Sequence, residues 1–185
     1  MKRLIGGAAF ALACGLSLSG CIDSATPILK DSQAVFGDRP NFQLYGLRKG
    51  FAIEPERVTF AWKDSVYRRI HGGLRDVTAF SVHPFENGLF IVQSTSTKQP
   101  PMTEYAVMRK LTGGVYQVTV IDEADADDAT RAAHCGKGEK NDRSCRITTR
   151  EQLFAFARAT AARQKDDGGL AIRLRDDEPK PPHRR

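Results

Sequence analysis

The sequence lacks an apolar run long enough to cross a membrane as a helix. Its main apolar stretch, Leu4 to Leu18, has about 15 residues, whereas a spanning helix needs roughly 20. The sequence also lacks the motifs G-x-S-x-G and H-E-x-x-H and a phosphate-binding loop ending in G-K-[ST]. Its four cysteines include no C-x-x-C pair, the spacing that zinc and redox-active sites favour. The chain therefore carries none of these catalytic or metal-binding motifs.

The first 21 residues carry the most informative pattern. Lys2 and Arg3 precede the apolar run, which is typical of a cleaved secretory signal. The run ends in Leu18-Ser19-Gly20-Cys21, and this ending resembles the lipobox of bacterial lipoproteins. Two alternatives are an ordinary signal peptide with a chance cysteine and an uncleaved helix.

The lipobox resemblance implies that Cys21 is the lipidation site. It implies diacylglycerol on the Cys21 thiol, cleavage before this residue and a further acyl chain, such as palmitate, on the new amino group. Two or more chains anchor a protein stably, since each buried CH₂ contributes about 0.8 kcal/mol. Ile22 rather than Asp follows the cysteine, which by the enterobacterial sorting rule implies the periplasmic face of the outer membrane. Asp23 comes next, so the inner membrane stays an alternative.

The charge of the chain is modest and dispersed. Cleavage after Gly20 would remove two of the 28 basic residues and none of the 22 acidic ones, which leaves a net charge of +4 on 165 residues. No cluster of basic and aromatic residues forms a nucleic-acid platform. We therefore expect membrane lipid as a partner through acylated Cys21, and no nucleic acid.

Cys135 and Cys145 are the two cysteines that signal cleavage and lipidation would leave free. In an oxidising periplasm, two thiols ten positions apart are predicted to form a disulfide around a polar loop. Metal binding with the neighbouring His134 is the alternative, but it lacks a tight cysteine pair and a regularly spaced fourth ligand. We predict no metal site and no cofactor.

The chain divides into four segments by composition. Residues 1–20 form the signal peptide, 21–41 the lipidated cysteine and a tether, 42–175 a single α+β domain, and 176–185 a disordered tail. Short alternating runs with turns between them predict about seven strands, beginning near Phe42, Val58, Val66, Val77, Leu89, Tyr105 and Val115. We expect an antiparallel β-meander that curls into a half-barrel or small barrel, with Leu170–Leu174 as a last edge strand.

A C-terminal amphipathic helix is expected to pack on this meander. Thr148 and Glu151 fit a capping box, and Leu153, Phe156 and Ala157 then form an apolar stripe. The stretch Cys145-Arg-Ile-Thr-Thr-Arg-Glu-Gln-Leu153 resembles a helix start found in small, uncharacterised proteobacterial lipoproteins. That resemblance implies a fold and no activity.

Three residue groups suggest chemistry, and each has a plain structural alternative. The histidines at 71, 83, 134 and 183 are isolated, which favours surface or packing roles. Five carboxylates between Asp122 and Asp128 suggest calcium, but an acidic helix start explains them more simply. The aromatic residues Trp62, Tyr67, Phe80, Phe85, Phe90, Tyr105 and Tyr116 could line an apolar cavity or fill a core.

The sequence therefore predicts a membrane-anchored periplasmic lipoprotein that is a structural or interaction module, with an envelope protein as a possible partner. It predicts no enzyme, because no catalytic residues can be assigned. The alternative is a carrier that binds a small apolar or lipid ligand in the curled sheet. A hydrolase with an unrecognised site is a third class.

Overall fold

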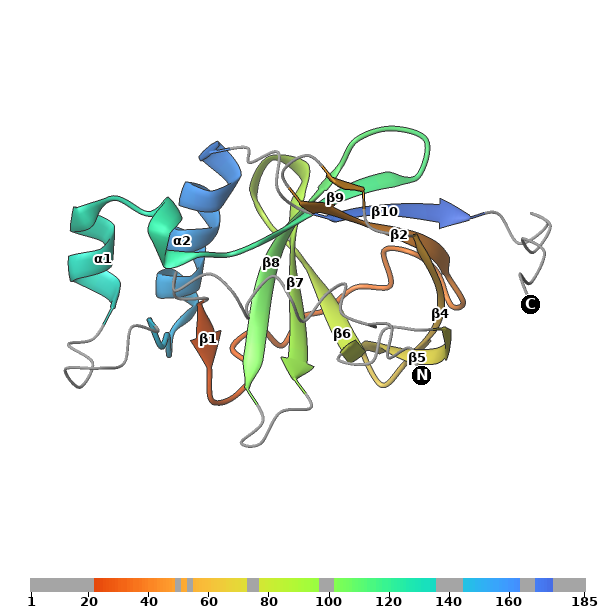
Figure 1. Cartoon of the computed structure of the whole chain (residues 1–185). Coiled ribbons are helices and arrows are strands. Elements are labelled where there is room, and N and C mark those ends of the chain that lie inside the picture. The colour runs from red at the N-terminus through yellow and green to blue at the C-terminus, as the bar shows by residue number, and fades with distance from the viewer. Residues whose placement is uncertain are drawn as a thin grey trace, which may run out of the picture.

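Eight antiparallel strands close into a barrel (Figure 1). The structure, a computed structural model, describes residues 22–48, 51–52, 55–72, 77–96, 102–135, 145–163 and 169–174. Neighbouring strands follow the order β8-β7-β6-β5-β4-β2-β10-β9, and pairing of β9 with β8 completes the ring. The predicted signal peptide, Cys21 and the predicted tail lie outside the described residues.

The barrel strands are β2 (Asn41–Arg48), β4 (Glu56–Lys63), β5 (Val66–Gly72), β6 (Val77–Pro84), β7 (Leu89–Ser96), β8 (Thr103–Lys110), β9 (Val115–Val120) and β10 (Gly169–Leu174). Two short strands pair outside the ring, β1 (Asp23–Ser24) with β8 and β3 (Phe51–Ala52) with β2. The helices are α1 (Asp128–His134) and α2 (Arg150–Arg163), with 3₁₀ turns η1 (Glu86–Gly88) and η2 (Glu123–Asp125).

Tight turns connect the meander where the sequence predicts them. Gly113 and Gly114 both have positive φ angles between β8 and β9, and Asn87 and Gly88 do so between β6 and β7. Such left-handed residues match the right-handed twist of antiparallel strands. The alternation of apolar runs and turn residues therefore located these strands correctly.

The role predicted for Leu170–Leu174 as an edge strand is wrong. The observed strand, β10, pairs with β2 on one side and with β9 on the other, so it closes the ring. The fold is thus α+β and mostly β, and it is a barrel rather than a half-barrel. A closed barrel has no free edges among its own strands, which removes a site of unwanted pairing. Because β10 follows α2, this helix is not the C-terminal element.

Large side chains fill the barrel interior. The inward set comprises Phe36, Phe42, Val58, Phe60, Tyr67, Val82, Met108, Tyr116 and Ala171, with Trp62, Phe80 and Phe90 packed against it. Val58, Phe60 and Trp62 share one face of β4, as their alternation predicts. Aromatic rings meet at centroid distances such as 4.9 Å for Phe36 and Phe42 and 4.8 Å for Phe60 and Phe80.

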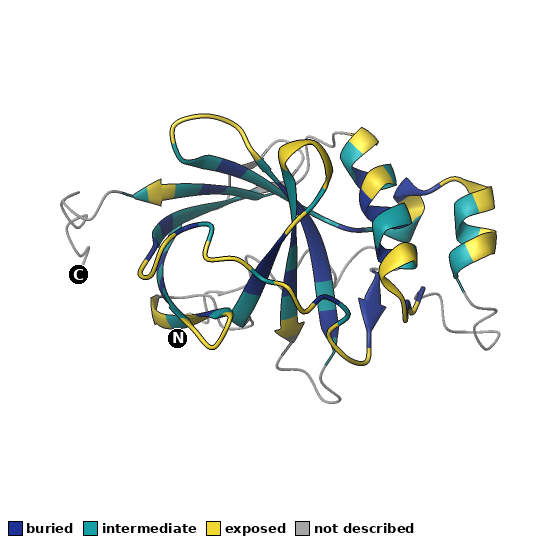
Figure 2. Ribbon diagram, turned by 180° about the vertical axis from the view of Figure 1, so that it is seen from behind, coloured by how far each residue is buried: buried dark blue, intermediate teal, exposed yellow. Residues whose placement is uncertain are grey.

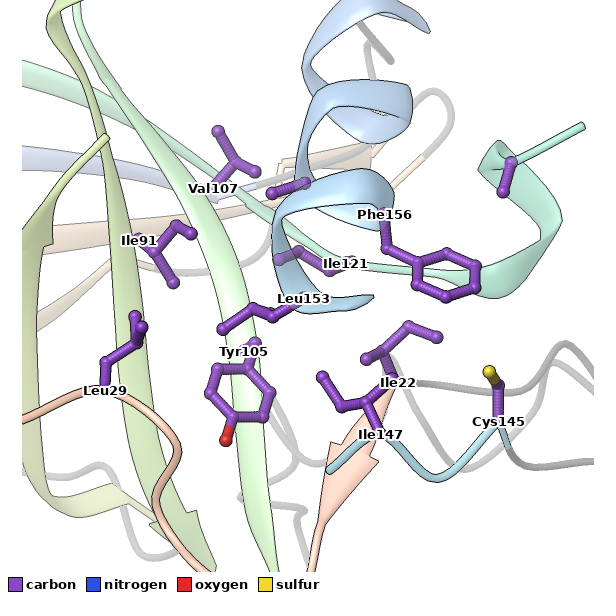
Figure 3. Packing of buried hydrophobic residues seen from close by; sticks show 12 residues of the cluster. Ile22, Leu29, Ile91, Tyr105, Val107, Ile121, Cys145, Ile147, Leu153 and Phe156 are labelled. Carbon is purple, nitrogen blue, oxygen red and sulfur yellow. The ribbon is translucent and has the colours of Figure 1, made fainter. Parts of the chain in front are cut away.

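A second core lies between the outer face of β7 and β8 and helix α2 (Figure 3). It contains Ile22, Leu29, Ile91, Tyr105, Val107, Ile121, Cys145, Ile147, Leu153, Phe156 and Ala157. Leu153, Phe156 and Ala157 of α2 are fully buried, and the opposite side of the helix is exposed (Figure 2). Strand β7 is therefore covered on both faces, by the barrel interior and by this second core.

The capping box of α2 lies one residue later than predicted. The amide of Gln152 donates to Thr149 Oγ1 over 3.3 Å, and the amide of Thr149 donates to Gln152 Oε1 over 3.1 Å. Thr149 is thus the N-cap and Gln152 its reciprocal partner, in place of Thr148 and Glu151. Gln152 also donates to the carbonyl of His134, which ties the start of α2 to the end of α1.

Candidate functional site

The residues that follow Cys21 are built into the folded domain, so the prediction of a tether is wrong for residues 22–41. Ile22 is fully buried, and its amide donates to the carbonyl of Ile121 over 3.2 Å. Leu29 and Phe36 are also buried, one in each core. We call Ile22, Asp23 and Ser24 the anchor junction, because they follow the predicted lipidation site directly.

The anchor junction is held between β8 and the segment that leads into α2. Asp23 and Ser24 lie opposite Glu104 and Thr103 of β8. On the other side, the amide of Ile147 donates to the carbonyl of Asp23 over 2.9 Å, and Arg146 Nε lies 3.6 Å from Asp23 Oδ1. Both backbone edges of this short strand are therefore engaged.

Ser24 starts a buried hydrogen-bond chain. Its hydroxyl donates to the carbonyl of Thr26 over 2.6 Å and lies 2.6 Å from the hydroxyl of Tyr105, which in turn accepts from the amide of Ile28. Since the Ser24 proton is directed to Thr26, the Tyr105 hydroxyl donates to Ser24. Burial raises the pKa of Tyr105 above its ordinary value.

The predicted cysteine pair is bonded and lies beside the anchor junction. Cys135 and Cys145 form a disulfide with their Cα atoms 5.0 Å apart, and Cys145 belongs to the same core as Ile22 (Figure 3). A carboxylate oxygen of Glu123 and the two sulfurs lie within 4.8 Å of one another. In the disulfide neither sulfur is a thiolate, and metal ions bind the thiolate form. This group therefore offers no thiolate ligand while the bond is intact.

Residues 25–40 form a strap across the barrel. The strap bonds to β7 through Leu29 and Gln93, to β6 through the amide of Gln33 and the carbonyl of Val82, and then reaches the barrel interior. There the amide of Phe36 donates to the Tyr67 hydroxyl over 2.8 Å. At its end, the carbonyls of Asp38 and Pro40 accept from the amides of Trp62 and Phe60.

A polar network under the strap centres on His83. Its Nδ1 lies 3.0 Å from the carbonyl of Asp31, and its Nε2 lies 2.8 Å from Ser81 Oγ. Because a carbonyl can only accept, Nδ1 carries the proton and Nε2 accepts from Ser81 in the neutral ring. Gln93 Nε2 donates to the same serine oxygen over 3.3 Å. Burial lowers the pKa of His83, with a smaller contribution from Arg150 in the same direction.

His83 was predicted to be an isolated histidine with a surface or packing role, and its place in this network was not predicted. Ser81, His83 and Gln93 occupy outward positions of β6 and β7 and are nevertheless buried. The signal that could have revealed it is the polar pair Ser81 and His83, two residues apart on the sheet face opposite Phe80 and Val82. His71 is exposed, and His134 lies against Phe156 with ring centroids 6.5 Å apart.

The acidic residues between Asp122 and Asp128 serve separate local roles. Asp122 accepts from the amide of Ala124, and Asp127 accepts from the amide of Thr130 as the N-cap of α1. This hydrogen bond lowers the pKa of Asp127. Asp125 is buried and accepts from the hydroxyl of Thr160 over 3.0 Å. Asp127 therefore fits the predicted acidic helix start, Asp122 caps the 3₁₀ turn η2, and Asp125 packs against α2.

The aromatic residues proposed to line a cavity are packed on other side chains. Trp62, Tyr67, Phe80, Phe90 and Tyr116 lie in the barrel core, and Phe85 and Tyr105 lie in or against the core under α2. Two surface hollows of about 340 and 320 Å³ flank the strap. Lys30, Arg150 and Phe154 line one, and Ser65, Phe80 and Thr95 line the other.

No helix within the described ranges is long and apolar enough to span a bilayer. Comparison of the chain with models of protein families, with curated proteins and with solved structures found no match.

Proposed function

We propose that this protein is a membrane-anchored lipoprotein of the cell envelope that acts by binding, as a structural or interaction module. The observation that carries the proposal is the position of the lipobox-like cysteine. Cys21 stands immediately before Ile22, the first buried residue of the described domain. Cleavage before Cys21 would remove none of the described elements, so signal processing and folding are compatible at this position.

The described residues offer no arrangement that indicates catalysis. Ser81 Oγ and His83 Nε2 are at hydrogen-bond distance, a contact that also occurs in hydrolases. Here both residues are more than nine-tenths buried, and the group that orients His83 is a backbone carbonyl of the strap. Their hydrogen bonds to the strap and to β7 account for them as parts of the fold.

The alternative function, a carrier of an apolar or lipid ligand, has less support. An eight-stranded barrel is just wide enough for side chains to fill or for one small ligand. In this barrel, Phe36 of the strap packs on Phe42 and Tyr116 with ring centroids 4.9 and 5.0 Å apart. A ligand inside would have to displace these rings.

Metabolic labelling with a palmitate analogue tests the anchor. The wild type should be labelled and recovered with membranes, whereas Cys21→Ser should be unlabelled and should retain residues 1–20. Cys14→Ser is the matched control, because it removes a cysteine of the same apolar run and should leave labelling unchanged. Equal labelling of the wild type and Cys21→Ser would contradict the proposal. Organic extraction of the purified domain that lacks the anchor tests the carrier, which predicts a stoichiometric bound lipid.

A further inference from the structure

The anchor junction, which directly follows Cys21, is fixed in the folded domain. Ile22 is fully buried among Ile121, Ile147 and Phe156 (Figure 3). Its own amide donates to the carbonyl of Ile121. The next two residues are paired to β8 on one side, and Asp23 is bonded to Ile147 on the other. The residue adjacent to Cys21 is therefore already fixed in the domain.

The strap, which follows the anchor junction, is also hydrogen-bonded to the barrel. Along the strap, Leu29, Gln33 and Phe36 are each bonded to a barrel strand by their backbone amides. These contacts are spread from β7 to β5, so the strap is bound to the barrel at several points along its length. A hinge between the anchor and the barrel therefore has no place within residues 22–40.

Covalent geometry converts this arrangement into a distance. Consecutive Cα atoms are about 3.8 Å apart, and Ile22, which directly follows Cys21 in the sequence, is fully buried. A flexible tether of 20 residues would have a root-mean-square span of about 25 Å. The expected separation between the lipid glycerol and the domain surface is thus shorter than a flexible tether would give.

We infer that the lipid anchor joins the barrel without a linker, so that the bilayer surface holds the domain in contact and in a restricted orientation. This inference rests on the proposed lipidation of Cys21. The face applied to the headgroups is the one around Ile22, formed by β1, the segment 145–147 and η2. Strand β5 lies on the side of the barrel away from α1 and α2 (Figure 1) and faces away from the lipid.

The acyl chains, and not charge attraction, hold this face against the bilayer. Arg146 is exposed next to the junction and pairs with Asp23, while Glu123 and Asp122 on and beside η2 carry the opposite charge. A face with both signs gains little from anionic headgroups, because attraction and repulsion offset each other. The orientation should therefore persist when the ionic strength is raised.

Rotation of the domain tests the absence of a linker. Trp62 is the single tryptophan; its ring lies 4.7 Å from that of Tyr67, and its amide is bonded to Asp38, so its fluorescence anisotropy reports domain motion. The lipidated protein is placed in vesicles of phosphatidylethanolamine and phosphatidylglycerol. One variant carries an insertion directly after Cys21 that consists of Ile-Asp followed by a Gly-Ser linker. The two residues that follow the lipidated cysteine are thus the same as in the wild type. The wild type should lack nanosecond domain tumbling, and the insertion variant should regain it.

The same linker inserted after Asp176 is the matched control and should behave as the wild type. Fast tumbling of the wild type, equal to that of the junction insertion, would overturn the inference while lipidation stands. If the wild type showed neither palmitate labelling nor vesicle association, the proposed function itself would be wrong. The two failures are thus separate.

Quenching by a headgroup spin-labelled lipid tests which face meets the bilayer. In a Trp62→Phe background, Arg146→Trp places the only tryptophan beside the junction, and Ile70→Trp places it on exposed β5. We expect strong quenching of the first variant and weak quenching of the second, in low and in high salt. Equal quenching of both, or stronger quenching at position 70, would overturn the assigned face.

Discussion

Protonation of His83 would disturb the buried hydrogen-bond network under the strap. The neutral ring donates from Nδ1 to the carbonyl of Asp31, which holds the strap to β6, and accepts at Nε2 from Ser81 of the same strand. A proton on Nε2 would reverse the second contact and make Ser81 an acceptor for both His83 and Gln93. Burial opposes this charge, as does Arg150, while the Asp31 side chain favours it. The folded state therefore favours the neutral form of His83.

We predict that the domain loses stability as the pH falls below about 6.5, the ordinary pKa of histidine. The lowered pKa of His83 means that the folded state binds fewer protons than the unfolded chain in this range, so acid favours unfolding. Urea unfolding at roughly pH 7.5 and roughly pH 5.5 should show this loss in the wild type. The loss of stability between the two pH values should be smaller in His83→Gln. It should be the same as in the wild type in His71→Gln, which alters an exposed histidine. A full pH dependence in His83→Gln would refute the assignment.

At the scale of single elements, sequence patterns located the strands and helix α2 but missed finer detail. The stretch Thr148-Thr149-Arg150-Glu151-Gln152 contains two overlapping capping boxes with similar residue types. Local sequence does not choose between them. The choice is set by the rotation of α2 that buries Leu153 and Phe156 in the core, and this depends on distant strands.

The two capping boxes predict different effects of threonine substitutions. Thr149→Ala removes the oxygen that accepts from the amide of Gln152 and should lower the free energy of unfolding by about 0.5–2 kcal/mol. Thr148→Ala, one residue earlier and also exposed, should have a clearly smaller effect. Thermal unfolding of the two variants decides the matter. A larger loss of stability for Thr148→Ala would mean that Thr148 is the N-cap, as the sequence pattern predicted.

At the scale of the whole molecule, the strap and the closing strand were the features that the sequence concealed. Ile22, Leu29 and Phe36 are large buried apolar residues of the anchor junction and the strap, and they are spaced seven apart without a strand or helix pattern. Their partners lie far away in sequence, so local composition indicated a tether. The disulfide could be predicted because two cysteines ten positions apart around a polar loop specify it locally, whereas lipidation of Cys21 stays a prediction from the motif. The network around His83 could not be predicted, because its members come from β6, β7 and the strap.

The final prediction concerns closure of the barrel by β10. Six residues of β10, Gly169 to Leu174, pair with β2, and four of them also pair with β9. A chain that ends after Gly168 would leave two long strand edges unpaired and would open the barrel core at Ala171, so it should not fold cooperatively. A chain that ends after Arg175 retains β10 and should melt like the full domain. Circular dichroism of both truncated domains, without the anchor, measures this difference. Cooperative unfolding of the shorter chain at the same temperature would mean that β10 is an added edge strand and that the remaining seven strands form a stable open sheet.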